Sequence, residues 1–312
     1  MNYKYTFTSF PSADGKSTVA AHIYAPAFGP VKGIVQLAHG MVDHVQRYEA
    51  LADYLTGRGY VFAGNDHLGH GSTAIADDDF GYFADEDSIN VVLKDMHTMN
   101  RLLRGDYPGL KPVIMGHSMG SFLSRLYVVK YPNSICGHII HGTGGPMGAI
   151  LPLGKALVSF LILLRGARYR SKFVKNLSFM GYNSKFPKEE GENAWLTRDT
   201  ETVKSKAADK RSGFTFTLAA YKDLYNMVGS SNSKRWFCDY PKSLRTVIMS
   251  GDMDPVGKYG DGPRYVYKHL LINGAADLSL KLYEGARHEL FNETCRDEVF
   301  ADIVSWMEAA AQ

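Results

Sequence analysis

The sequence predicts an α/β fold with a mostly parallel central sheet, helices on both faces of the sheet and a helical cap insertion. Short apolar runs of strand length recur along the chain, and segments with the apolar spacing of helices lie between several of them. Buried strands that alternate with amphipathic helices are typical of parallel sheets covered on both faces. One long segment, residues 146–241, is helical, basic and aromatic in character and has no clear core strand.

The expected elements follow from the N-terminus. Residues 3–7 and 19–23 alternate apolar and polar side chains, which predicts half-buried antiparallel strands. Buried strands are then predicted at residues 33–38, 60–63, 113–115, 138–140, 245–249 and 278–283, and amphipathic helices at residues 48–55, 89–103 and 299–306. We therefore expect a core of residues 1–145 and 242–312, with residues 146–241 inserted as a cap. An insertion at the carboxyl edge of an open α/β sheet lies where such sheets bind ligands.

Composition excludes several classes of protein. The chain has 312 residues, of which 45% are apolar and 21% charged, which is close to globular averages and unlike a disordered chain. The net charge of +3, from 35 Lys and Arg against 32 Asp and Glu, is too even to favour a nucleic-acid partner. The three cysteines, Cys136, Cys238 and Cys295, are far apart, so we expect neither a disulfide framework nor a zinc site.

No segment of the sequence is typical of secretion or of membrane insertion. Residues 1–10 lack a basic stretch followed by an apolar core. The longest apolar stretch, residues 149–164, contains Pro152 and Lys155 and is shorter than the ~20 apolar residues of a membrane span. A soluble, cytoplasmic protein is the expectation that follows.

The apolar stretch is followed by a basic segment, residues 165–175. Together they are consistent with a lid that lines an acyl pocket, and also with a helix that makes transient contact with an anionic membrane surface. We favour the lid, because interfacial helices more often spread their basic residues along a polar face. The two interpretations are compatible in a protein that binds lipids.

A candidate nucleophile lies near the middle of the chain. Residues 116–120 read Gly-His-Ser-Met-Gly, after the apolar run at 113–115 and before a segment, residues 122–130, that can form a helix. A strand, a tight turn and a helix are the context in which G-x-S-x-G forms a nucleophile elbow, because the glycines permit the turn. The hydroxyl of Ser118 is therefore the candidate nucleophile.

A serine nucleophile needs an imidazole to accept its proton and a carboxylate to orient that imidazole. In this type of fold the expected chain order is serine, then acid, then histidine. The last two predicted strands are followed by these partners, with Asp252 and Asp254 after one strand and His288 after the other. Both aspartates are candidates. We favour Asp254, at the loop tip before Pro255, and expect Asp252 to order the turn by bonding its own backbone.

The other histidines near the motifs are weaker candidates for the base. His39, His67 and His70 lie too early in the chain for the expected order. His117 precedes the nucleophile, and we expect the elbow to point its side chain away. His288 is therefore the candidate base.

Attack on a carbonyl places negative charge on its oxygen, which fixed backbone N–H groups stabilise. One donor is expected from the residue after the nucleophile, Met119, at the start of a helix. The other is expected from the loop after residues 33–38, where Gly40 permits a bend and the N–H of Met41 is the candidate. The alternative is a His-Gly turn with a structural role only.

These motifs resemble those of a known group of enzymes. The segments at residues 39–48, 66–72, 116–120, 250–254 and 283–288 resemble the monoacylglycerol lipase and lysophospholipase-like serine hydrolases of the α/β-hydrolase fold. The resemblance spans nearly the whole core. It implies that Ser118, Asp254 and His288 form a catalytic triad, that Met41 and Met119 are the oxyanion donors, and that the substrate is an acyl ester of a monoacyl lipid.

The segment from Asp66 to His70, Asp-His-Leu-Gly-His, contains residue types that bind metals. A metal site needs further ligands at compatible spacing, and no H-E-x-x-H helix occurs in the sequence. The resemblance implies that the segment is a structural loop near the site. The implied mechanism needs no cofactor and no metal ion.

The leading hypothesis is thus a serine carboxylic ester hydrolase whose partner is a small acyl ester or lipid. The same triad would also serve a proline-releasing aminopeptidase, a thioesterase or an acyltransferase. An aminopeptidase holds the free amine of its substrate with carboxylates, for which Glu189, Glu190 and Glu192 are candidates. A non-catalytic ligand receptor on the same fold is disfavoured, because every residue type of a working triad is present.

Overall fold

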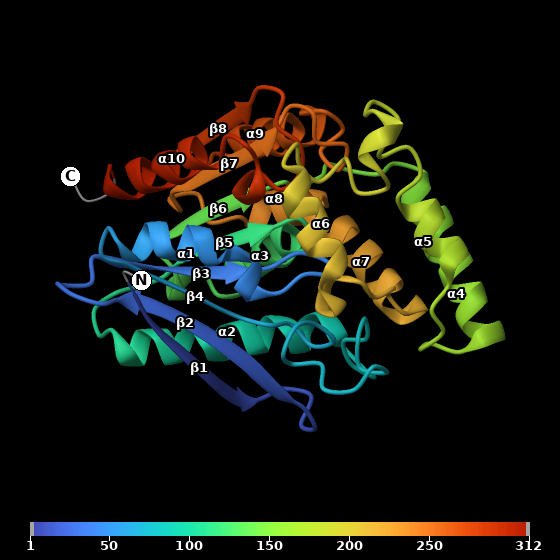
Figure 1. The fold of residues 1–312 in the computed structure, drawn as a ribbon, viewed down its shortest axis with the longest axis horizontal. Helices are drawn as coiled ribbons and strands as arrows, with labels where there is room; N and C mark the ends of the chain where they lie inside the picture. Colours follow the sequence, from blue (N-terminus) through green and yellow to red (C-terminus); the bar gives the residue numbers. More distant parts are fainter. Residues whose placement is uncertain (1–2, 310–312) are drawn as a thin grey trace.

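A computed structural model describes residues 3–309, which form an eight-stranded sheet with the order β1-β2-β4-β3-β5-β6-β7-β8 (Figure 1). The strands are β1 (Tyr3–Pro11), β2 (Thr18–Pro26), β3 (Gly33–Ala38), β4 (Tyr60–Asn65), β5 (Val113–His117), β6 (Gly137–His141), β7 (Thr246–Gly251) and β8 (Leu278–Tyr283). β1 with β2 and β2 with β4 pair antiparallel, and the strands from β4 across to β8 pair parallel. The predicted α/β fold with a mostly parallel sheet is confirmed.

Helices cover both faces of this sheet, as Figure 1 shows. On one face lie α1 (Glu49–Thr56) and α10 (Arg296–Glu308), whose Leu51 and Val299 are fully buried in one apolar core. On the other face lie α2 (Ser88–Asp106), α3 (Met119–Lys130) and α9 (Asp261–Ile272), in a second core that includes Met96, Leu123 and Val266. The central strands are consequently buried on both sides, which explains their continuous apolar runs.

A helical insertion follows β6 and ends before β7. It contains α4 (Ile150–Arg165), α5 (Lys172–Ser178), α6 (Thr200–Ala208), α7 (Leu218–Ser231) and α8 (Lys234–Asp239). All of this segment is described, and no strand occurs in it, as the sequence predicts. α7 packs on α3 of the core and on α4, and Figure 1 shows α4 and α5 (yellow-green) on the side of α7 that faces away from the sheet. The limits 146 and 241 of a separate cap stay a prediction.

The remaining helices are short. Single 3-10 turns lie at Val45–Tyr48, Pro132–Ser134, Lys188–Glu190, Lys210–Ser212 and Leu290–Asn292. Within residues 3–309, no helix has both the length and the apolar character needed to cross a membrane.

Candidate active site

Ser118 lies on a strained turn between a strand and a helix. β5 ends at His117 and α3 begins at Met119, so Ser118 alone makes the connection. Its backbone has φ 54° and ψ −120°, a conformation that residues other than glycine rarely adopt. This is the predicted strand, turn and helix of a nucleophile elbow.

Close backbone approaches explain the two glycines of the motif. A Cβ atom added to Gly120 would lie 1.9 Å from the carbonyl oxygen of Ala38, and one added to Gly116 would lie 2.3 Å from the carbonyl oxygen of Gly120. Both distances are far below van der Waals contact, and both partners are backbone atoms that cannot move aside. Glycine at position 120 therefore lets helix α3 approach β3 closely, and glycine at position 116 lets the end of β5 approach α3.

Asp254 and His288 are joined by a buried hydrogen bond. Asp254 Oδ2 lies 3.0 Å from His288 Nδ1, and both side chains are almost completely buried. The other oxygen, Asp254 Oδ1, accepts the N–H of Val256 at 2.9 Å, which fixes the carboxylate plane. The structure thus pairs His288 with the aspartate that the sequence analysis favours.

Asp252 has a different partner from the one expected. Its Oδ1 accepts the backbone N–H of Gly285 at 2.7 Å, in the turn after β8, and not a group of its own turn. The expectation that Asp252 bonds its own backbone is wrong, because the loop after β7 packs against the loop after β8. Asp252 ties these two loops together and leaves Asp254 for His288.

Ser118 and His288 lie at the same edge of the sheet. The N–H of Ser118 donates to the carbonyl oxygen of His141 at 3.0 Å. A Cβ atom on the next residue, Gly142, would lie 3.2 Å from His288 Cε1. The imidazole therefore packs against the ends of β5 and β6, where the serine sits.

The ring of His117 lies beside His288, with 4.8 Å between the ring centroids. The expectation that the elbow points this side chain away is wrong. His117 is buried, and its Nδ1 lies 2.6 Å from Nδ1 of His141, so one of these nitrogens donates to the other. Burial, with a smaller effect of His288, lowers the pKa of His117 to about 3. His117 is therefore neutral at pH 7 and packs next to the candidate base.

The loop after β3 reaches Ser118. A Cβ atom on Gly40 would lie 3.3 Å from the Cβ atom of Ser118, so this loop touches the serine. Met41 follows Gly40 directly, and Met119 occupies the first position of α3, where the backbone N–H has no partner within the helix. Of the two predicted oxyanion donors, Met119 thus directly follows the serine, and Met41 directly follows the loop residue that touches it.

The buried loop that contains His67 and His70 packs around His39. The N–H of His67 donates to His39 Nε2 at 2.9 Å, while His39 Nδ1 lies 2.9 Å from the carbonyl oxygen of Gly40. The ring centroids of His67 and His70 lie 4.1 Å and 5.2 Å from that of His39. Across residues 3–309, no cluster of three or more His, Cys, Asp or Glu is arranged to hold a metal ion. The loop supports the segment that precedes Met41.

The insertion reaches the site through Trp195. Its ring centroid lies 5.1 Å from that of His288, and its carbonyl oxygen accepts the N–H of His288 at 3.4 Å. Phe214 and Phe216 lie elsewhere, with their rings 5.3 Å and 5.4 Å from that of His70. Of these three aromatic residues of the insertion, Trp195 therefore contacts the candidate base, whereas Phe214 and Phe216 pack on the supporting loop.

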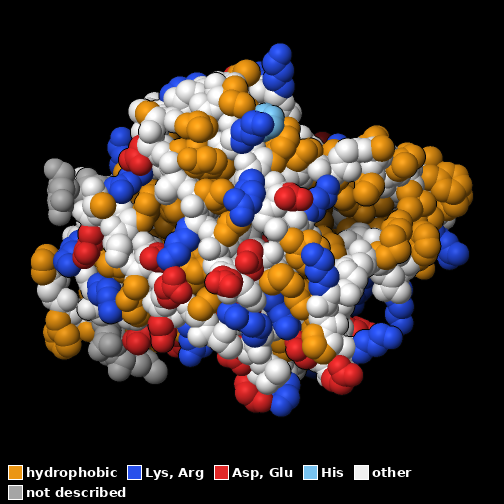
Figure 2. Space-filling model, turned by 90° about the horizontal axis from the view of Figure 1, so that it is seen from above, with side chains coloured by type: hydrophobic (Ala, Val, Ile, Leu, Met, Phe, Trp, Pro, Cys, Tyr) orange, Lys and Arg blue, Asp and Glu red, His pale blue; other side chains and the backbone are white. Residues whose placement is uncertain are grey.

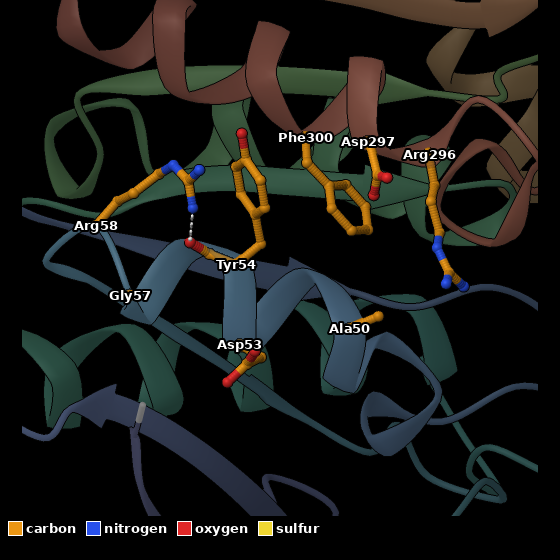
Figure 3. A pocket seen from close by; sticks show the side chains of 8 residues that line it. All are labelled: Ala50, Asp53, Tyr54, Gly57, Arg58, Arg296, Asp297 and Phe300. Atoms are coloured by element: carbon orange, nitrogen blue, oxygen red, sulfur yellow. Dashed lines mark hydrogen bonds between the residues drawn. The ribbon is translucent and has the colours of Figure 1, made fainter. Parts of the chain in front are cut away.

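Two surface hollows lie away from these residues. One, of about 380 Å³, lies between α1 and α10, where Arg58 stacks on Tyr54 and donates to its carbonyl oxygen (Figure 3). The other, of about 590 Å³, lies between α3 and the insertion and is lined by Leu126 and Trp236 among others. Neither lining includes Ser118, Asp254 or His288.

A family model described as serine aminopeptidase, S33, which groups hydrolases, matches residues 29–295. The chain belongs to this hydrolase family. Because the match covers most of the chain, it confirms that the protein is a hydrolase enzyme with the α/β-hydrolase fold.

Several proteins similar to this S33 hydrolase are named as lipases or esterases. It is 25% identical over 299 residues to a monoacylglycerol lipase of Mycolicibacterium smegmatis, with 94% of each chain covered. It is 26% identical over 288 residues to the monoglyceride lipase of Homo sapiens, with 89% of this chain and 83% of the other covered. A thermostable carboxyl esterase from Bacillus coagulans, solved in complex with glycerol, is 30% identical, with a TM-score of 0.90 and 98% of both chains covered. The resemblance to monoacylglycerol lipases is confirmed, and the predicted class of carboxylic ester hydrolase is supported.

Proposed function

We propose that this S33 hydrolase cleaves acyl esters of monoacyl lipids, of the monoacylglycerol lipase or lysophospholipase type, through an acyl-enzyme on Ser118. One observation carries the proposal. The buried Asp254–His288 hydrogen bond lies at the same sheet edge as a serine on a strained elbow. This supports the proposal, because a serine hydroxyl is activated by an imidazole that a carboxylate orients.

The proposed reaction has two halves. His288 accepts the proton of Ser118 as the hydroxyl oxygen attacks the ester carbonyl, and it returns that proton to the departing alcohol when the ester bond breaks. Water then gives a proton to His288 and attacks the acyl-enzyme; the bond to the serine oxygen breaks, His288 returns the proton to that oxygen, and the fatty acid is released. Asp254 stays ionised and holds the proton-bearing Nδ1, while the N–H groups of Met41 and Met119 stabilise the oxyanion. These steps use side chains, backbone and water.

The carboxylates proposed for an aminopeptidase are not placed for amine binding. Glu190 forms an ion pair with Arg287, the residue before His288, so its charge is already balanced within the protein. Glu189 and Glu192 are exposed. This geometry, together with the names of the relatives, favours an ester over an amide substrate.

A comparison of substrates tests the proposed reaction. We expect turnover of a monoacylglycerol, a lysophospholipid and a short p-nitrophenyl ester, with the highest kcat/KM for a monoacyl lipid, and no turnover of an aminoacyl p-nitroanilide above background. Initial rates at matched enzyme concentration provide the measurement. Faster cleavage of the anilide than of every ester would overturn the proposal in favour of an aminopeptidase.

The insertion, proposed as a cap over the site, exposes an apolar surface formed by α4 and α5. Exposed large apolar side chains lie along both helices and in the turn after α5: Ile150, Leu153, Phe160, Leu163, Leu164, Phe173, Leu177 and, in the turn, Met180. Figure 2 shows the apolar side chains gathered on the right of the molecule, where α4 and α5 lie in Figure 1. Of the α4 residues, Val158 is fully buried. A contiguous apolar patch of this kind marks an interaction site.

We propose that this α4–α5 surface contacts the lipid surface that carries the substrate. Lys172 and Lys175 are exposed beside the apolar side chains of α5, and their charge suits anionic headgroups. Arg168 and Arg170 are held by the core instead, since Arg168 stacks on Tyr82 and Arg170 donates to the carbonyl oxygen of Phe80 at 2.9 Å. The part of the basic segment that lies next to the patch is therefore free to meet a membrane.

Removal of two exposed apolar side chains is expected to weaken vesicle binding. Leu163 is 85% exposed and Phe173 is 63% exposed, and each would lose roughly 1.5–3 kcal/mol of transfer free energy on replacement by aspartate. We expect the double variant L163D/F173D to sediment at least tenfold less with phosphatidylserine-containing vesicles. Its rate on a soluble ester should stay unchanged. Phe28→Asp, at a 91% exposed loop position, is the matched control, and equal loss of binding in that control would contradict the proposal.

A further inference from the structure

Four buried charged side chains form a continuous network next to the candidate active site. Arg47 bridges two carboxylates, donating to Asp43 Oδ1 at 2.9 Å and to both oxygens of Glu289 at 3.1 Å and 2.7 Å. Lys206 donates to Glu289 Oε1 at 2.7 Å. The side chains are between 2% and 13% exposed, so the network is shielded from solvent. Its two positive and two negative charges balance.

Each end of the network is attached to a part of the site. Asp43 Oδ2 accepts the backbone N–H of Gly40, the residue before the proposed oxyanion donor Met41. Glu289 directly follows His288 in the chain. Lys206 belongs to α6 of the insertion. The network therefore joins three segments: the loop after β3 with Gly40 and Met41, the loop after β8 with His288, and the insertion.

The insertion also holds the backbone around His288. The N–H of Glu289 donates to the carbonyl oxygen of Leu196 at 2.7 Å. On the other side of the histidine, Arg287 donates to the carbonyl oxygen of Ala194 at 2.6 Å. The residues on both sides of the candidate base are thus bonded to the insertion, and Lys206 adds the charged contact.

We propose that Lys206 is a positioning residue for the reaction. It holds the carboxylate of Glu289, and through Glu289 it keeps the loops of His288 and Gly40 in their active arrangement. Its positive charge also balances the negative charge of Glu289, the residue next to His288. The proposal rests on the proposed function of Ser118, Asp254 and His288. A side chain of the insertion then sets the rate of the chemical step without touching the substrate.

The charge balance follows from the environment of Glu289. Burial raises the pKa of this carboxyl, but the charges of Arg47 and Lys206 outweigh burial and hold the pKa well below its usual range. Glu289 therefore stays ionised at neutral pH. If Lys206 loses its charge, one negative charge is left uncompensated beside His288, and the protonated imidazole is favoured. If Glu289 loses its charge, the excess is positive and the neutral imidazole is favoured.

Other charged and titratable groups near the imidazole are common to all the variants considered. These groups are Asp254 from the loop after β7, His117 from β5, His141 from β6, and Tyr182, which lies near Asp254. Burial lowers the pKa of both His117 and His141, so they stay neutral across the working range. If the acidic limb of the pH profile moves in opposite directions when Lys206 and Glu289 are replaced, the shifts therefore come from the network itself.

The test compares Lys206→Met with Glu289→Gln in the 312-residue chain. Lys206→Met is expected to lower kcat on a soluble ester roughly ten- to hundredfold with little change in KM, because small misplacements of catalytic groups are costly. It should also move the acidic limb of the kcat/KM profile to higher pH by roughly half a unit. Glu289→Gln is expected to move that limb to lower pH. Lys206→Arg, which keeps the charge, should restore most of the rate.

Lys204→Met is the matched control, because Lys204 lies on the same helix, is 72% exposed and pairs with Glu201 at the surface. Its profile should match the wild type. Equal pH profiles and kcat values in wild type and Lys206→Met would overturn the proposal, as would shifts of the same sign in Lys206→Met and Glu289→Gln. If Lys206→Met fails to fold, Lys206→Gln and Glu289→Gln decide the sign of the shift. Wild-type enzyme that turns over no ester contradicts the proposed function instead.

Discussion

Replacement of Ser118 by alanine is expected to lower kcat for ester hydrolysis by roughly 10⁶-fold, as loss of the nucleophile does in other triad hydrolases. The change removes one oxygen atom and keeps the Cβ atom that packs near Gly40. Because the backbone strain at φ 54° is present in both proteins, the thermal midpoint should stay close to that of the wild type. Turnover of a p-nitrophenyl ester and a thermal melt provide the two measurements.

The matched control for this change is Ser230→Ala, at an exposed position of α7. It should keep the wild-type rate. A folded Ser118→Ala protein that keeps even a tenth of the wild-type kcat would show that another group is the nucleophile, because the oxyanion hole and substrate binding alone leave only a small residual rate.

Replacement of Asp254 by asparagine is expected to lower kcat by roughly 10⁴-fold. The N–H of Val256 donates to Asp254 Oδ1, so an asparagine there keeps its carbonyl oxygen on Val256 and turns its NH₂ group toward His288. Nδ1 of the imidazole then has to accept this hydrogen bond, which places the ring proton on Nε2. An imidazole in that tautomer cannot accept the proton of Ser118.

Asp252→Asn is a closely matched control, two residues away in the same loop. The carbonyl oxygen of an asparagine at this position still accepts the N–H of Gly285, so the two loops stay joined and the rate should stay near that of the wild type. A larger loss of kcat in Asp252→Asn than in Asp254→Asn would exchange the roles of the two aspartates. Single-turnover rates with a chromogenic ester distinguish the outcomes.

The central strands could be predicted from the sequence because they are buried on both faces, whereas β8, predicted as a buried strand, lies at the edge of the sheet and buries Tyr283 alone of its six residues. The apolar runs at β3 and β8 have the predicted ends, at 33–38 and 278–283. β4 and β5 extend beyond the predicted runs to Asn65 and His117, which are polar but buried. An apolar run ends at the first polar residue, so it cannot predict a strand that continues through buried polar residues. The strand ends near the candidate site were therefore the hardest to predict.

The contacts between distant segments could not be read from the local sequence. Lys206 and Glu289 are separated by 83 positions, and nothing in the pattern around α6 distinguishes Lys206 from the exposed Lys204. The one signal for Glu289 is its place directly after His288. The contact of His117 with His288 was likewise missed, because it depends on how the loop after β8 folds over the end of β5.

Labelling with a fluorophosphonate probe tests the central claim most directly, because the probe reacts with an activated serine and leaves a stable adduct. We expect a single adduct, mapped by peptide mass spectrometry to Ser118, formed in parallel with loss of ester hydrolysis and formed far more slowly in Asp254→Asn. An enzyme that hydrolyses esters while Ser118 stays unmodified, or that is inactivated by an adduct on another residue, would contradict it.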